Sequence, residues 1–229
     1  MGLLPKYKIE ELKREKREAK AAKKRKENTR SEIVRFLIVC EGSRTEPNYF
    51  QALVRDRYSE VRDEKIVGEG KSTCALVKRT LQIKEELERK RQLTFDRVWV
   101  FDKDDFVDFN EAIQLAASYS FQSAWTNEAF ELWYFLHFQY LDAGISRHDY
   151  IEKLQSEIRK HPGYENYEYK KNDASVYKML TTIGNEDLAK RYAERLRSFF
   201  EGDEDYKEHK PCTTVDLLVS ELESPEKLL

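Results

Sequence analysis

Residues 36–50 read FLIVCEGSRTEPNYF: an apolar run stops at Glu41, and a polar turn then leads into a helix. Five consecutive apolar residues are typical of a strand that is covered on both faces, as in a parallel sheet. Pro47 suits the first turn of the helix, and either Ser43 or Thr45 is suited to cap its N-terminus. This junction of strand and helix predicts an α/β fold.

The same alternation continues along the chain. Further strands are predicted at 64–68, 97–101 and 120–125, and helices at 73–91, at 107–117 and from Asn127 to about Leu141. Strands that alternate with helices form parallel sheets with right-handed crossovers. We therefore expect a Rossmann-like parallel sheet that is flanked by helices.

The last third of the chain has a different pattern. A polar, turn-rich loop is predicted at 161–173, two helices over 173–201 separated by Gly184 and Asn185, and a closing helix in TTVDLLVSEL (213–222). These patterns predict three regions: a basic helical arm (1–32), an α/β core (33–145) and a mostly helical C-terminal elaboration that packs on the core (146–229).

The charges are unevenly distributed along the chain. The formal net charge is −2, but residues 1–30 contain twelve Lys and Arg against five Glu, and the remainder contains 29 basic against 38 acidic residues. A basic arm on an acidic body suggests contact with a polyanion, or a solvated tail. In the first interpretation Lys23, Lys24 and Arg25 would contact nucleic acid.

Several classes of protein are disfavoured. Three dispersed cysteines argue against a disulfide framework, and the lack of paired Cys and His spacings argues against a zinc site. No apolar run reaches the roughly 20 residues needed to span a bilayer, and the N-terminus is too charged for a secretory signal. A cytoplasmic protein without membrane contact is therefore expected. Because no GxxxxGK[ST] sequence is present, any ATPase activity is expected to belong to a partner.

Three carboxylates follow two of the predicted strands. Glu41 ends the first apolar run, and Asp102 and Asp104 follow RVWVF (97–101). The carboxyl ends of parallel strands meet in one crevice, and residues two apart in extended backbone point to the same side. Clustered carboxylates repel one another unless a cation joins them, and hard oxygen ligands favour Mg²⁺ or Mn²⁺. Helix capping is the alternative, but the pairing of the two strand ends favours a metal site.

A fourth carboxylate, Glu131, lies inside the apolar stretch FELWYFLHF (130–138) and is therefore expected to be buried. A lone buried carboxylate is costly without a partner. Glu131 would serve as a further metal ligand, as a group that is hydrogen-bonded to a metal ligand, or as the acidic partner in a buried salt bridge to an arginine. Asn127 is expected on the same face of the same helix, and His137 is interpreted as a core histidine.

Five segments occur together in the order found in a known family. They are IVCEGSRTEPNYF (38–50), VFDKDDF (100–106), NEAFELWYFLHF (127–138), YKKND (169–173) and KPCTTVDLLVSEL (210–222). Over residues 33–222 the chain resembles the RloB-like family of bacterial defence proteins. More broadly, a strand ending in Glu-Gly followed by one ending in Asp-x-Asp resembles the Toprim pattern of topoisomerases, bacterial primases and OLD-type nucleases. Most relatives carry Asn-Pro-x-Phe-Glu where this chain has Asn-Glu-Ala-Phe-Glu, which keeps Asn127 and Glu131.

The resemblance implies a Toprim-like core and a Mg²⁺-dependent nuclease. Such a protein would be the toxic effector of an antiviral, abortive-infection system, with an ABC- or AAA-type ATPase encoded nearby. Lys170 and Lys171 match a lysine-containing segment of the family. Lys171 would stabilise the pentavalent phosphate or protonate the leaving oxygen, and an ordinary solvated lysine pair is the alternative. Arg44 and Glu46 are near enough to Glu41 to hold a phosphate or to order the site.

Two functions compete at this stage. In the first, Glu41, Asp102 and Asp104 hold one or two cations for hydrolysis of RNA (host tRNA, by analogy) or DNA, with Glu41 as a ligand or as the general base. In the second, the chain is a catalytically weak Toprim-like sensor or interaction subunit of an ATPase complex. Nucleotidyl transfer is less favoured because a zinc-binding region and a second catalytic domain are lacking. A homo-oligomer is compatible with either function.

Overall fold

The structure is a computed structural model that describes residues 34–57, 62–69, 73–92, 94–103 and 107–224, with residues 62–64 and 101–103 described by their backbone alone. From Val34 onward the chain forms one compact unit. The predicted basic arm (1–32) lies outside the described residues, together with its Lys23, Lys24 and Arg25.

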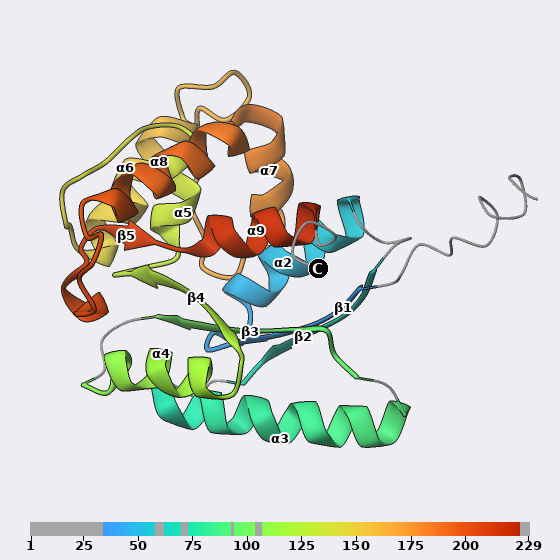
Figure 1. Cartoon of the computed structure of the whole chain (residues 1–229). Helices are drawn as coiled ribbons and strands as arrows, with labels where there is room; N and C mark the ends of the chain where they lie inside the picture. Colours follow the sequence, from blue (N-terminus) through green and yellow to red (C-terminus); the bar gives the residue numbers. More distant parts are fainter. Residues whose placement is uncertain (1–33, 58–61, 70–72, 93, 104–106, 225–229) are drawn as a thin grey trace, which may run out of the picture. The chain divides into compact units, whose positions relative to one another are not determined.

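A five-stranded sheet runs through this unit (Figure 1). Its strands are β1 (Val34–Cys40), β2 (Arg62–Gly68), β3 (Arg97–Lys103), β4 (Gln122–Asn127) and β5 (Cys212–Thr213), in the spatial order β2-β1-β3-β4-β5. The first four pair in parallel, and β5 pairs antiparallel with the end of β4. The predicted parallel sheet is confirmed for β1 to β4. The antiparallel β5 is an addition to it, since a strand of two residues carries no periodic signal in a sequence.

Helices cover both faces of the sheet (Figure 1). On one face lie α3 (Thr73–Arg91) and α4 (Phe109–Ser118); on the other lie α2 (Thr45–Arg57), α5 (Glu131–Leu136), α6 (Arg147–Ile158), α7 (Val176–Ile183), α8 (Glu186–Ser198) and α9 (Val215–Glu223). This arrangement confirms the predicted α/β fold of Rossmann or Toprim type. None of the described helices combines the length and the apolar character that a membrane crossing requires.

The continuous apolar run of β1 is explained by burial on both of its faces. Phe36 and Ile38 pack in the core with α2, α5 and α9, whereas Leu37 and Val39 pack in a second core with α3 and α4. All four side chains are fully buried. Side chains alternate across a strand, so a strand needs apolar residues at every position only when helices cover both faces.

The helix predicted from Asn127 to Leu141 is wrong in its limits. Asn127 is the last residue of β4, and α5 spans only six residues from Glu131. Between them Glu128 has a φ of +81°, which a continuous helix does not allow. The Asn127 amide donates a hydrogen bond of 2.7 Å to the carbonyl oxygen of His209. Asn127 therefore fixes the loop before β5 and shares no helical face with Glu131.

The C-terminal helices begin and end at recognisable signals. Gly184 ends α7 and Asn185 caps α8, so the predicted break between these two helices is confirmed. α6 lies where the sequence analysis predicts no element. Its signal is Ser146 followed three residues later by Asp149, which form a capping box at its N-terminus.

Candidate functional site

The carboxyl ends of β1 and β3 lie side by side. Cys40 is opposite Phe101 in the register of these parallel strands, so the next residues, Glu41 and Asp102, stand level near the carboxyl ends of the two strands. Neighbouring strands are about 4.8 Å apart. The fold thus brings together two positions that are far apart in the sequence. Asp102 is described by its backbone alone, and Asp104 lies outside the described residues.

A further carboxylate, that of Glu46, packs against the turn that follows Glu41. Glu46 lies in the first turn of α2 and is only 6% exposed. A Cβ atom at Gly42 would lie 1.8 Å from Glu46 Oε2, so any larger residue there would displace this carboxylate. Within the described part of the chain, Oε2 is buried without a hydrogen-bond partner. Such an atom is costly in a folded protein, which makes it a candidate for ligand binding.

The charges around Glu46 define an anionic site. Burial raises the pKa of Glu46 to about 7, and its own backbone N–H opposes that shift. The charges of Glu131 and Glu41 raise this pKa further, whereas the charge of Lys171 lowers it. Glu41 and Glu46 belong to the turn after β1 and the start of α2, Glu131 to α5 and Lys171 to the loop at 161–173, so the site combines three segments that are distant in the sequence. Near pH 7 the Glu46 carboxyl is divided between its protonated and ionised forms.

Glu131, the first residue of α5, is 4% exposed and bonds to a tyrosine. Its Oε1 accepts a hydrogen bond of 2.8 Å from the hydroxyl of Tyr169. Burial, the Glu131 charge and this hydrogen bond raise the pKa of Tyr169, so that the hydroxyl remains a donor. In the described part of the chain no Lys or Arg forms an ion pair with Glu131. Among the described residues, Glu131 thus has a hydrogen bond from an uncharged donor in place of the expected alternative, a salt bridge to an arginine.

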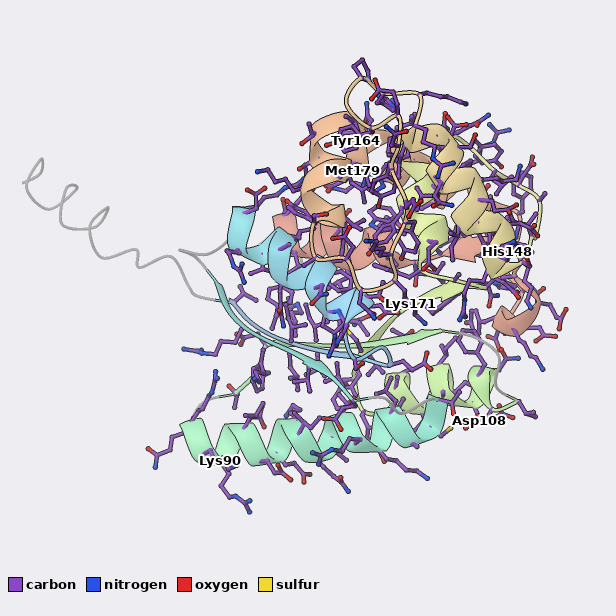
Figure 2. The ribbon with its side chains drawn as sticks, turned by 180° about the vertical axis from the view of Figure 1, so that it is seen from behind. Lys90, Asp108, His148, Tyr164, Lys171 and Met179 are labelled. Atoms are coloured by element: carbon purple, nitrogen blue, oxygen red, sulfur yellow. The ribbon has the colours of Figure 1, made fainter. Side chains whose placement is uncertain are left out.

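The loop that carries Lys171 is fastened to the start of α2. The hydroxyl of Thr45 donates to Asn172 Oδ1 at 3.0 Å, and the amide of Asn48 donates to the Asn172 carbonyl at 3.1 Å. Figure 2 shows Lys171 beside the first turn of α2. Lys170 and Lys171 are both exposed, and only Lys171 contributes to the charge balance of Glu46. Thr45 thus anchors the loop.

Two other residues of interest lie apart from the carboxylates. Arg44 is exposed, and its carbonyl accepts the first hydrogen bond of α2, from the backbone N–H of Asn48 at 2.8 Å. His137 is fully enclosed, and its Nδ1 lies 2.9 Å from the carbonyl oxygen of Trp133. Burial lowers the pKa of His137 to about 4, so the ring is neutral at pH 7. Its surroundings are those of the core histidine that the sequence predicts.

The donor set fits a hard divalent cation. Carboxylate oxygens are the ligands that Mg²⁺ and Mn²⁺ prefer. The pKa of Glu46 is raised mainly by burial and further by the charges of Glu131 and Glu41, and a nearby cation would favour its ionised form. Among the described residues no three His, Cys, Asp or Glu side chains are arranged to hold a metal ion. That set does not include the Asp102 side chain or Asp104. Glu41, Glu46 and Glu131 therefore supply carboxylate oxygens of the type that such a cation prefers, but these three do not by themselves form a metal-holding group.

The sequence analysis did not identify Tyr169, and it predicted for Glu46 only that it would hold a phosphate or order the site. Glu46 looks like an ordinary acidic residue in a first helical turn, and only the neighbouring Gly42 indicates that its carboxylate is packed inward. Tyr169 adjoins the lysine pair, but its hydrogen bond to Glu131 crosses 38 positions of the sequence. No local pattern predicts a contact of that range.

A comparison with protein families identifies a family to which this chain is similar. Residues 36–222, most of the chain, match the model of a family described as RloB-like protein. A comparison with curated proteins found no match. The matched range contains Glu41, Glu46, Glu131 and the loop at 161–173.

Proposed function

Since the chain belongs to the RloB-like family, a membership that fits a defence-associated protein, we propose that it is a metal-dependent nuclease of Toprim type. The observation that supports this proposal is the register of β1 and β3. Because Cys40 is opposite Phe101, Glu41 and Asp102 stand level near the carboxyl ends of β1 and β3. Glu46 of α2 and Glu131 of α5 supply two buried carboxylates. Carboxylates gathered at the carboxyl ends of parallel strands are typical of sites that handle phosphate with a divalent cation.

The residues proposed to hold Mg²⁺ or Mn²⁺ are Glu41, Asp102 and Asp104, with Glu46 or Glu131 as a further ligand. A bound cation would supply activation of water and stabilisation of the charge that develops on the leaving oxygen. The hydrogen bond from Tyr169 holds the Glu131 carboxylate in one orientation, as positioning groups around metal ligands do.

Proton transfer is assigned to the chain's own groups. Glu41 is proposed as the general base if it does not serve as a metal ligand. Lys171 is proposed to offset the charge of the transferred phosphate or to protonate the leaving oxygen. Arg44 and Lys170, both exposed at the rim, are proposed to contact the phosphate backbone of the substrate.

The proposed substrate is RNA or DNA, and a role in defence favours host tRNA by analogy. Lys23, Lys24 and Arg25 of the basic arm are proposed as further nucleic-acid contacts. An ABC- or AAA-type ATPase is the proposed partner, and a homo-oligomer is compatible with this assembly. A nuclease that can kill its own cell is expected to be silent alone, so its activity is to be assayed with the partner present.

The first test is Mg²⁺ and Mn²⁺ binding by calorimetry on the full chain. We expect the wild type to bind the cation and both Glu41→Ala and Asp102→Asn to lose that binding, because each variant removes a carboxylate ligand at the carboxyl ends of β1 and β3. Glu86→Gln is the matched control: this glutamate lies on α3 and its side chain is 47% exposed. Wild-type chain that binds neither cation, or Glu41→Ala that binds as tightly as wild type, would contradict the proposal.

The second candidate is a catalytically weak sensor or interaction subunit of an ATPase complex. The contrast between the basic N-terminal 30 residues and the acidic remainder favours it, because charged surfaces of opposite sign are suited to docking. The two functions separate in one assay with the partner present. If Asp102→Asn abolishes cleavage and keeps partner binding, the chain is the nuclease; if cleavage is absent throughout and only partner binding depends on the chain, it is the interaction subunit.

A further inference from the structure

The side of β4 that faces away from β3 is hydrogen-bonded to another strand over only part of its length. β5 covers Thr126 and Asn127, and Trp125 bonds to Thr214, the residue that follows β5. At Val215 the chain turns into α9 and leaves the edge. Among the described residues no strand pairs with 122–124 on this side. An open strand edge is a template for a further strand.

The hydrogen bonds of Trp125 show which backbone N–H and C=O groups of β4 face away from β3. Its N–H donates to Thr214 Oγ1 at 2.8 Å, and its carbonyl accepts from the Thr214 N–H at 2.9 Å. The Trp125 backbone therefore faces away from β3. Backbone groups alternate along a strand, so the N–H and C=O of Ser123, two residues earlier, face the same outer side. They are the pair that an added strand would use.

A groove of about 540 Å³ runs along this edge. α4 contributes Ile113 and Ala117, and α9 contributes Leu217. Trp125 and Tyr206 also line the groove and pack in one cluster with Ile113. Figure 1 shows α4 and α9 on opposite sides of β4. Leu217 is 44% exposed, so its side chain is accessible to a bound segment. The groove thus combines a strand edge with apolar walls for side chains on both faces of an added strand.

His209 provides a second, independent indication of a ligand. It lines the groove and is 4% exposed, yet its Nε2 has no hydrogen-bond partner among the described residues. Asp203 Oδ2 lies 3.6 Å away, beyond hydrogen-bond distance, and the Phe200 ring stacks on the imidazole at 4.4 Å. Buried polar atoms in proteins are normally hydrogen-bonded, and among the described residues Nε2 has only this ion-pair contact with Asp203, which leaves a hydrogen bond to a ligand open.

The charges of the groove select the class of ligand. Asp203 and Glu204 contribute two carboxylates to its lining. The arginine that lines it, Arg197, is occupied by the Asp216 carboxylate through two hydrogen bonds, one of 2.8 Å. Phosphates would therefore meet net negative charge, which disfavours nucleic acid, whereas Lys or Arg side chains would be attracted.

We propose that this groove binds an extended, basic peptide segment of a protein partner, which adds a strand to the free edge of β4. The affinity would come from backbone hydrogen bonds to Ser123, and the specificity from apolar side chains against Leu217 and basic side chains near Asp203. The surface does not depend on the nuclease function, because its residues do not include the carboxylates of the candidate site.

The test is fluorescence anisotropy with a short labelled peptide in which Lys and Val alternate, titrated with the full chain. We expect salt-dependent binding that falls about tenfold in Ser123→Pro, because proline removes the outward N–H and leaves the pairing with β3 intact. Ser123→Ala is the matched control and should bind as wild type. The same peptide N-methylated at alternate backbone positions should also bind about tenfold less well, which tests the strand edge even if Ser123→Pro does not fold.

Four outcomes would overturn the proposal. The first is an N-methylated peptide that binds as tightly as the parent, and the second is a peptide with Glu in place of Lys that does so. The third is a single-stranded oligonucleotide that competes for the groove and is sensitive to Ser123→Pro, which would make it a nucleic-acid site. The fourth is wild-type dimerisation that Ser123→Pro abolishes, which would assign the edge to a second copy of the chain.

Discussion

Two groups of buried carboxylates in this molecule have opposite surroundings. The first group lies on α9, where Asp216 and Glu221 are 5% and 4% exposed. Arg197 bonds to the Asp216 carboxylate with both terminal nitrogens, and Arg97 Nε lies 2.5 Å from Glu221 Oε1. Each negative charge that α9 buries is thus accompanied by a positive charge.

The second group lies in the first turn of α2 and at the start of α5. Glu46 and Glu131 are as deeply buried as the α9 pair, but in the described part of the chain neither forms an ion pair. Glu131 bonds to a neutral tyrosine, and the charges near Glu46 are mostly of its own sign. The buried carboxylates of α9 are paired with arginines, whereas Glu46 and Glu131 have no such positively charged partner among the described residues. Such a site is suited to a cation that is not part of the chain.

The largest effect is expected from removing the arginine of the first group. Arg197→Met leaves the Asp216 charge buried without compensation, which costs about 3–5 kcal/mol. We expect a fall of that size in the free energy of unfolding, measured in urea. The double variant Arg197→Met/Asp216→Leu should recover most of the loss, because no unpaired charge remains. Equal losses in the single and double variants would show that Arg197 acts by packing and not by charge compensation.

The next effect is expected from neutralising Glu46 in the second group. Its pKa is about 7 in the folded chain against an ordinary value of 4.5, so the folded state holds this proton to higher pH than the unfolded state. The free energy of unfolding therefore falls as pH rises from 4.5 to 7, by about 3 kcal/mol. Glu46→Gln removes this penalty. The variant should match wild type near pH 4.5 and exceed its stability by up to about 3 kcal/mol at pH 8.

The difference between variant and wild type is the quantity to measure. His137, whose pKa is lowered to about 4, adds a contribution of opposite sign between pH 4 and 6.5, and this cancels in the difference. Glu86→Gln on α3, which replaces a glutamate with a side chain that is 47% exposed, is the control. Added Mg²⁺ should stabilise wild type more than Glu46→Gln at pH 8. A difference that stays constant from pH 5 to pH 8 would mean that neither burial nor the neighbouring carboxylates raise the pKa of Glu46 in the folded chain.

The smallest effect is expected from the hydrogen bond between Tyr169 and Glu131. Tyr169→Phe leaves the buried Glu131 carboxylate without its donor and should lower the free energy of unfolding by about 1–3 kcal/mol. Tyr167→Phe is a matched control in the same loop, because the Tyr167 hydroxyl is buried without a hydrogen-bond partner among the described residues. Urea unfolding measures both variants. If the two lose equal stability, Tyr169 contributes its ring and not its hydroxyl.

Most of the fold could be predicted from sequence because its signals are local. The run FLIVC requires cover on both faces, and the alternation that follows it gives a parallel sheet. The limits of α5 could not be predicted, since apolar periodicity does not reveal that Asn127 ends a strand and that Glu128 takes a positive φ. The same limitation hides β5, whose two residues pair with β4 only after the chain returns from α8.

The sequence by itself determined the α/β class, the strand ends at Glu41 and Asp102 and, through the RloB-like motifs, the family. These depend on residue type and on short spacings, which fix secondary structure and its order. Only the tertiary structure decided that β1 and β3 are neighbours in register, that Glu46 is turned inward against Gly42, and that Glu131 meets Tyr169. Such contacts depend on how distant segments pack, and burial and neighbouring charge set the properties of a carboxylate only once that packing exists.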